Sequence, residues 1–253
     1  MLKEIIIAVQ AYWKAHLFIK THKLWKWILI PGILYCILFM ISMYYFAHTS
    51  NNFIEWLTLK TGLKNWLDKL DSGWMGFFFT ISSFALWLVM MLFYFSLFKY
   101  VFLLVGSPIF AYLSQKIEAI IEEKPFQFNS SQLLKDIKRS SSIVTRNIIR
   151  QSIYVIALLF ASIIPVIGLI VPIIALFVES YYYGFSMLDY CMNRHSKPKG
   201  ESVFFITNHQ GYAIGNGMLF YSMHWIPILG WVLAPAYAIV AATFSIYPLK
   251  ELQ

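Results

Sequence analysis

Charged side chains are absent from four long stretches of the chain, and these stretches predict its main helices. Residues 27–54, 72–98, 151–178 and 202–249 contain no Asp, Glu, Lys or Arg. A helix needs about 20 mostly apolar residues to cross the hydrocarbon core of a bilayer, which is roughly 30 Å thick. Each of the first two stretches fits one complete crossing. We therefore expect an all-α integral membrane protein with two long transmembrane helices within residues 24–106.

Each of the last two stretches is interrupted by a Pro-x-x-Gly motif, first at Pro165 and Gly168 and again at Pro227 and Gly230. Proline removes a backbone donor and glycine tolerates positive φ, so each motif predicts a helix break. The uncharged limb 151–164 reaches only about 21 Å as a helix, which is short of a complete crossing. We expect partly penetrating helical hairpins that return to the same side, with two complete crossings per hairpin as the alternative. The expected hairpins cover residues 148–193 and 200–248.

The remaining segments predict amphipathic helices that lie along the membrane surface. In segment 1–23, lysines and large apolar side chains fall on largely opposite faces. Segment 107–147 begins with Ser107 as the expected N-cap and Pro108 at the first helical position. We place this second segment on the cytoplasmic side. Together with the spans and hairpins, these segments make residues 1–253 a single membrane domain.

Composition and charge support a membrane location. Apolar residues make up 59% of the chain and charged residues 13%, whereas a typical soluble domain has about 25% charged residues. The net charge of +8 comes from basic residues that flank the apolar stretches, so we expect contact with anionic lipids and no nucleic-acid partner. By the positive-inside rule, the basic segments 1–26, 116–150 and 190–200 place both termini in the cytoplasm and the loop 48–72 outside. The expected location is the bacterial inner membrane.

A stripe of cations on the helix expected at 131–150 is the main candidate for chemistry. Lys135, Arg139, Arg146 and Arg150 recur at offsets of four, seven and four residues, which keeps them within about 60° of one another on a helix. One interpretation is a cationic face on anionic lipid headgroups. The other is an electrostatic funnel that concentrates a small anion at a pore mouth, where arginine forks suit tetrahedral oxyanions.

Three further charged residues lie in or beside apolar stretches: Lys99, Glu179 and Asp189. Ionisable groups at membrane depth usually face the interior of a helix bundle or water. A buried Glu179 needs a cationic partner, for which Arg146 and Arg150 are our candidates. In the alternative interpretation, all three side chains lie at the interface and extend toward water.

No motif predicts an enzyme, a metal site or a bound cofactor. The histidines lack the spacing of a zinc-binding helix, and the sequence has no nucleotide-binding loop. Cys36 and Cys191 are far apart in sequence and are interpreted as small apolar core residues. Gly211 and Gly215, four residues apart, are interpreted as a place where two helices approach closely. We therefore expect a protein without enzymatic activity.

Five short blocks of residues occur in the order and at the spacing of a known family. They are Lys26–Pro31, Ser107–Glu118, Ile164–Gly168, Leu188–Tyr190, and Gly215–Gly217 followed by Pro227 and Pro235. Through these blocks the chain resembles the CysZ-type sulfate permeases and, more broadly, the bacterial etoposide-induced-protein domain proteins. The resemblance implies a helical membrane protein with two long spans and two partly penetrating hairpins. It also implies a homo-oligomer that takes up sulfate passively.

The sequence departs from the sulfate permeases at the arginine motif that precedes the first span. Trp25 stands at the first arginine position, and Lys26 retains one cation. Lysine is a point charge without the planar fork of arginine. Lys23 and His22 lie close enough in sequence to compensate for the missing arginine. Cys191 also stands where the family has proline.

Two functional hypotheses follow from the sequence. The first is a permease or channel-like protein for passive uptake of a small anion such as sulfate, formed by an oligomer around the hairpins. The second is a non-conducting membrane scaffold that organises lipids through the same basic stripes. For the first hypothesis, the expected anion-binding residues are Lys23, Lys26, Arg139, Arg146 and Arg150.

Overall fold

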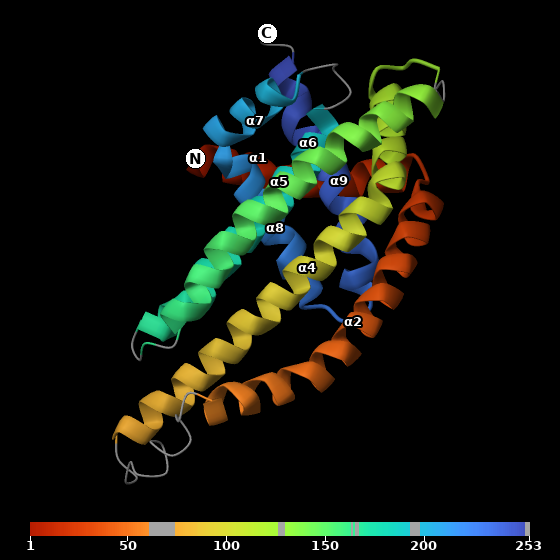
Figure 1. Ribbon diagram of the computed structural model, residues 1–253. Coiled ribbons are helices and arrows are strands. Elements are labelled where there is room, and N and C mark those ends of the chain that lie inside the picture. Colours follow the sequence, from red (N-terminus) through yellow and green to blue (C-terminus); the bar gives the residue numbers. More distant parts are fainter. Residues whose placement is uncertain (61–73, 126–129, 163, 165–166, 193–197, 251–253) are drawn as a thin grey trace.

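All the elements that the computed structural model describes are α-helices. It describes residues 1–60, 74–125, 130–162, 164, 167–192 and 198–250. The helices are α1 (Leu2–Thr21), α2 (Trp25–Lys60), α4 (Trp74–Ile121), α5 (Ser130–Ser162), α6 (Ile167–Met192), α7 (Lys199–Asn208), α8 (Gln210–His224) and α9 (Leu229–Lys250) (Figure 1).

Five of the described helices contain a segment that is long and apolar enough to cross a membrane. These segments are Trp25–Thr49 in α2, Trp87–Ile121 in α4, Ile137–Ser162 in α5, Ile167–Met192 in α6 and Leu229–Tyr247 in α9. The protein is therefore an all-helical membrane protein, as the charge-free stretches predicted. Helix α1, helix α7 and the end of α9 lie at one end of the molecule. The C-terminal end of α2 and the N-terminal end of α4 lie at the other (Figure 1).

The helix expected to begin at Ser107 and Pro108 does not begin there. Instead, α4 continues through Pro108 to Ile121. Proline at position 108 cannot donate the backbone hydrogen bond that Leu104 would accept four residues earlier. The Ser107 hydroxyl donates to the Leu104 carbonyl over 2.9 Å and takes the place of that bond. Ser107, which we interpreted as an N-cap, thus supplies a donor for the Leu104 carbonyl inside one long helix.

Both expected helix breaks occur at the Pro-x-x-Gly motifs. α5 ends at Ser162 and α6 begins at Ile167; Pro165 lies outside the described residues, and Gly168 is in the first turn of α6. α8 ends at His224 and α9 begins at Leu229, so Pro227 is in the turn and Gly230 is in the first turn of α9. The candidate spans in α5 and α6 are longer than the limb 151–164, and α8, with 15 residues, is not among the candidate spans.

The turn between α8 and α9 holds a β-branched residue in the left-handed region. Ile228 has φ of 64°, a conformation that costs roughly 1–2 kcal/mol for a residue other than glycine. Hydrogen bonds close the turn around it, from the Leu229 amide to Pro227 O over 2.7 Å and from the Gly230 amide to Ile226 O over 2.9 Å. The surrounding backbone therefore holds Ile228 in a strained position.

Close helix crossings depend on glycine. A Cβ added to Gly184 on α6 would lie 1.9 Å from Ala213 O on α8, and one added to Gly217 on α8 would lie 1.9 Å from Ser180 O on α6. A Cβ on Gly215 would lie 2.8 Å from the Ala8 Cβ of α1. The interpretation of Gly211 and Gly215 as a helix-packing site is therefore confirmed, and α1 is the helix that approaches them.

Helix α1 packs one face against the bundle and exposes large apolar side chains on the other. Ala8, Ala11 and Ala15 are buried where α1 packs against α8 and α9. The exposed face carries large apolar side chains: Leu2, Ile6, Val9, Trp13 and Leu17. Such a face suits the apolar side of a membrane interface.

Candidate functional site

A fully buried ion pair lies at the centre of the helix bundle. Lys99 Nζ of α4 is 2.6 Å from Glu179 Oε2 of α6, and the two side chains are 3% and 1% exposed. Both residues lie inside candidate membrane-spanning segments. Charged groups at such positions are costly and usually have a functional role, so this pair is the first element of the candidate site.

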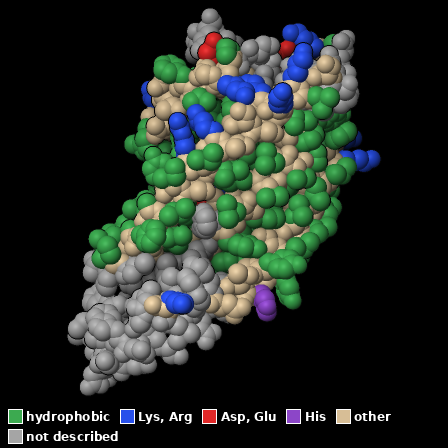
Figure 2. Space-filling model, in the orientation of Figure 1, with side chains coloured by type: hydrophobic (Ala, Val, Ile, Leu, Met, Phe, Trp, Pro, Cys, Tyr) green, Lys and Arg blue, Asp and Glu red, His purple; other side chains and the backbone are tan. Residues whose placement is uncertain are grey.

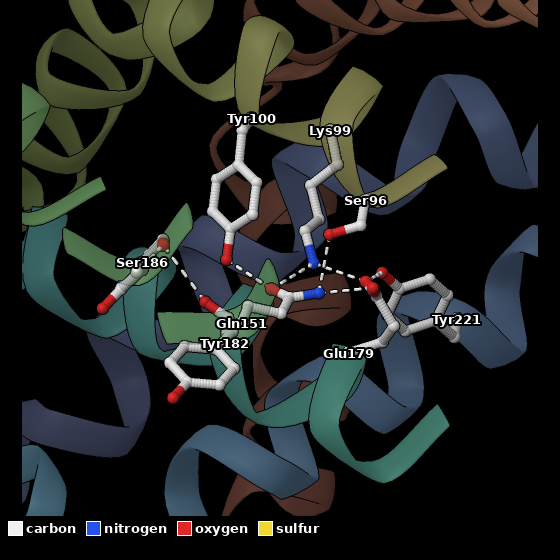
Figure 3. Close-up of polar contacts among 9 residues, drawn as sticks. Ser96, Lys99, Tyr100, Gln151, Glu179, Tyr182, Ser186 and Tyr221 are labelled. Carbon is white, nitrogen blue, oxygen red and sulfur yellow. Dashed lines mark hydrogen bonds and ion pairs between the residues drawn. The ribbon is translucent and has the colours of Figure 1, made fainter. Parts of the chain in front are cut away.

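Polar groups from two more helices complete the surroundings of the pair. Gln151 of α5 accepts a hydrogen bond from Lys99 Nζ over 3.1 Å and donates through Nε2 to Glu179 Oε1. Tyr221 of α8 donates to Glu179 Oε2 over 2.8 Å. Figure 3 shows Lys99, Gln151 and Tyr221 converging on Glu179 from separate helices.

Two α4 side chains form further hydrogen bonds with the amide oxygen and nitrogen of Gln151. The Tyr100 hydroxyl donates to Gln151 Oε1, and Gln151 Nε2 donates to Ser96 Oγ over 2.7 Å. The ring of Tyr100 also lies 4.8 Å from Lys99 Nζ, within the range of a cation–π interaction. Buried charges are tolerated only when such partners satisfy them, so these polar groups hold the ion pair in place as a unit.

The partner of Glu179 is therefore Lys99, and the expected pairing with Arg146 or Arg150 was wrong. On α5, the side chain that faces Glu179 is Gln151, which is fully buried. Arg150 is one residue, about 100° of helix rotation, away from Gln151 and is exposed. Helix phase thus turns Arg150 outward and leaves the lysine of α4 to neutralise the carboxylate.

Asp189 also has a cationic partner, which lies at the other end of the α5–α6 contact. Arg139 Nη1 is 3.3 Å from Asp189 Oδ1, and the Ser202 hydroxyl of α7 donates to the same carboxylate oxygen over 2.7 Å. Asp189 is 2% exposed in this pair and Arg139 is 14% exposed. Lys99, Glu179 and Asp189 are all buried, so none of the three side chains extends toward water as the alternative interpretation expected.

Arg146 lies between these two ion pairs. Its Nη2 donates to Asn147 Oδ1 over 3.2 Å, and its guanidinium carbon is 5.0 Å from the centre of the Phe185 ring. Among the described residues, Arg146 Nε and the Nε and Nη2 of Arg139 are buried without a hydrogen-bond partner. Both arginines therefore keep donors inside the protein that a bound anion can use.

These contacts form a row of polar pairs between α5 and α6, which we call the α5–α6 seam. Its cross-helix contacts are Arg139–Asp189, Asn147–Ser186 and Gln151–Glu179. The row ends in a small apolar cluster of Val89, Val155 and Val171, each at most 1% exposed. The polar pairs of the seam thus extend from the level of Asp189 to the level of Glu179, and the seam is apolar beyond Glu179.

The other expected anion-binding residues, and Lys135 of the cation stripe, lie outside the seam. Lys135 and Arg150 are exposed on α5, and Lys23 and Lys26 are exposed at the turn between α1 and α2, where Lys23 has φ of 52°. No contact among the described residues joins Lys23 or Lys26 to the cations of α5. Figure 2 shows a group of lysine and arginine side chains near the end of the molecule that carries the termini, beside a broad hydrophobic band.

Sequence reasoning missed Gln151, Tyr221 and the role of Lys99. Gln151 is the only amide side chain in the stretch 151–178 and follows Asn147 by four residues. Two amides on one helical face at the start of an apolar limb are a signal for a polar contact inside the bundle. The sequence around Tyr221 contains no comparable signal.

These features define a multi-span helical membrane protein with a charged and polar interior, the class to which membrane transport proteins belong. The family model described as "Sulfate transporter CysZ/Etoposide-induced protein 2.4" matches residues 11–235, and the chain belongs to this family. The protein named sulfate transporter CysZ from Pseudomonas syringae pv. tomato is 24% identical over 224 residues, which cover 85% of this chain and 82% of that protein. The resemblance inferred from the five short blocks is therefore confirmed.

Proposed function

We propose that this protein is a passive pathway for a small oxyanion, with sulfate as the first candidate. The α5–α6 seam is the observation that carries the proposal. It places two half-buried arginines with unpartnered donors and a buried lysine along one row of polar pairs between membrane-spanning helices. Arginine donates parallel hydrogen bonds that fit the oxygens of a tetrahedral anion. Membership of a family described by sulfate transport supports the same substrate class.

The basic end of the molecule supplies the electrostatic attraction in this proposal. The net charge is +8, and exposed cations raise the local concentration of anions at the mouth of a pathway. Arg150 and Lys135, together with Lys23 and Lys26, attract anions from solution, and Arg146 and Arg139 then bind them in the seam. Phe185 and Asp189 hold the guanidinium groups in position.

We also propose that the α8–α9 hairpin penetrates the membrane only partly and that several copies assemble around the hairpins. Helix α8 has 15 residues, about 22 Å at about 1.5 Å per residue. Large apolar side chains cover the outer face of α5 and α6, among them Ile153, Phe160 and Ile170. Such a face fits lipid or a second copy of the chain.

Uptake of radiolabelled sulfate into proteoliposomes tests the proposed function. The wild-type protein is expected to exceed empty liposomes, and Arg146→Gln is expected to lower the flux about tenfold, because one charge-assisted contact is lost. Lys60→Gln is the matched control, since Lys60 is an exposed cation at the end of α2. It should leave the flux unchanged.

Flux equal to that of empty liposomes for sulfate and for other oxyanions would contradict the proposal. In that case the lipid-organising alternative predicts that anionic lipid co-purifies with the protein. It also predicts that the lipid is lost when Arg139, Arg146 and Arg150 are all replaced by Gln. Lipid loss in this triple variant without any change in flux would favour the lipid-organising function.

A further inference from the structure

The deepest polar group of the α5–α6 seam is the Lys99–Glu179 ion pair, and it has the features of an exchangeable contact. We infer that Lys99 is the innermost anion contact of the pathway and that Glu179 is its resident counter-ion, from which Lys99 separates when the transported anion arrives. This inference rests on the proposed function. It assigns the selectivity of the pathway to one ion pair.

The position of the pair along the helices supports this assignment. On α5, Gln151 is followed one turn later by Val155, and on α6, Val171 precedes Glu179 by about two turns. Val155 and Val171 pack with Val89 of α4 in the apolar cluster that closes the seam. An anion that enters from the arginine end therefore meets Lys99 before it meets this apolar barrier.

The ammonium group of Lys99 can hold an anion without losing all its present contacts. A lysine ammonium has three donors, and two of them are directed to Gln151 Oε1 and Glu179 Oε2. The contact to Gln151 and the nearby ring of Tyr100 stay in place if only the bond to Glu179 is given up. Exchange then replaces one negatively charged oxygen by another.

Glu179 keeps two hydrogen bonds when Lys99 turns from it to the anion. Its Oε1 still accepts from Gln151 Nε2, and its Oε2 still accepts from the Tyr221 hydroxyl. A buried carboxylate without donors would be strongly unfavourable, so these two neutral donors make the exchange possible. Tyr221 and Gln151 are positioning residues in this scheme, because they hold the carboxylate aside and do not contact the anion themselves.

The scheme also predicts selectivity for doubly charged oxyanions. The Lys99 ammonium and the guanidinium groups of Arg139 and Arg146 together attract a divalent anion more strongly than a monovalent one at the same distance. An oxyanion has several oxygens, so it can accept hydrogen bonds first from an arginine of the seam and then from Lys99. Chloride has one charge and no oxygens to accept directed hydrogen bonds. Removing Lys99 should therefore lower chloride flux less than sulfate flux.

Flux measurements on charge variants of the pair test the inference. We expect Lys99→Met to lower sulfate flux about tenfold or more and chloride flux by less, so that the sulfate-to-chloride ratio falls. Glu179→Gln is expected to lower the sulfate concentration that half-saturates flux, because the counter-ion no longer competes for Lys99. The double variant Lys99→Met/Glu179→Gln should keep the low sulfate flux of Lys99→Met, since the cation is absent in both.

Equilibrium binding of sulfate to the purified protein in detergent gives a second readout. Binding should persist in Lys99→Met, because Arg139 and Arg146 are intact, and a purely structural role for Lys99 would reduce binding and flux together. The double variant removes both charges and remains informative if a single variant fails to fold. Wild-type flux with an unchanged sulfate-to-chloride ratio in Lys99→Met or in the double variant would overturn the inference. Wild-type protein without any sulfate flux would instead remove the proposed function and, with it, the exchange.

Discussion

Replacing Gly217 by valine is expected to prevent the protein from folding. The Cβ alone would lie 1.9 Å from Ser180 O and 2.5 Å from the Ser180 carbonyl carbon, both in the backbone of α6. Overpacking a core with side-chain atoms costs about 1–3 kcal/mol when neighbours can shift. A backbone carbonyl in a helix cannot move aside without moving α6, and Gly184 fixes the same crossing against Ala213. The expected cost is therefore at or above that range.

Size-exclusion chromatography of the detergent-extracted protein measures this effect. Gly217→Val should give aggregate or no protein, whereas the wild type gives a single peak. Gly200→Ala is the control, because nothing lies within 4 Å of a Cβ at position 200 in α7. Alanine is also the better helix former by about 1 kcal/mol. A Gly217→Val protein with the peak and melting temperature of the wild type would contradict the α6–α8 packing described above.

Replacing Lys99 by methionine is expected to destabilise the protein by about 3–5 kcal/mol, the usual cost of removing one partner of a buried ion pair. Glu179 would then be a buried carboxylate with two neutral donors, Gln151 and Tyr221. The double variant Lys99→Met/Glu179→Gln removes both charges, and Gln at position 179 keeps an oxygen that accepts from Tyr221. Its stability should therefore return close to that of the wild type.

A double-mutant cycle checks this prediction. It compares thermal unfolding, in one detergent, of the wild type, Lys99→Met, Glu179→Gln and the double variant. The coupling between positions 99 and 179 should be large and favourable, since the neutral donors around a lone buried charge compensate only part of the loss of its partner. Additive effects of the two substitutions would show that the charges do not depend on each other, and would contradict the buried pair. Lys60→Met, at an exposed cation of α2, controls for loss of positive charge and should change stability by less than about 0.5 kcal/mol.

Local sequence rules located the helix breaks and the close helix contacts. The breaks at Pro227–Gly230 and before Gly168 follow from backbone chemistry within a few residues. The same rules failed at Ser107 and Pro108. A serine next to a proline can either cap the start of a new helix or donate to a free carbonyl inside a helix that continues through the proline. The hydrogen bond from Ser107 to Leu104 decides for the second case, and it depends on the helix already being present.

The pairing of buried charges could not be predicted from neighbouring residues. Glu179 follows Arg150 by 29 positions and Lys99 by 80, so proximity in sequence favoured the arginine. The choice depends on the rotation of α5 against α6 and on the place of α4 beside them. Both are set by packing of many side chains across the bundle and not by any local pattern. The presence of buried charge was predictable, and its partner was not.

Ion selectivity of the purified protein in planar bilayers is the most direct test of an anion pathway inside this protein. With a gradient of potassium sulfate across the bilayer, the wild-type current is expected to reverse near the equilibrium potential of sulfate. Arg146→Gln is expected to give a smaller current. A current that reverses at the potassium potential, or no current above that of the bare lipid together with no tracer flux, would contradict an anion pathway along the α5–α6 seam.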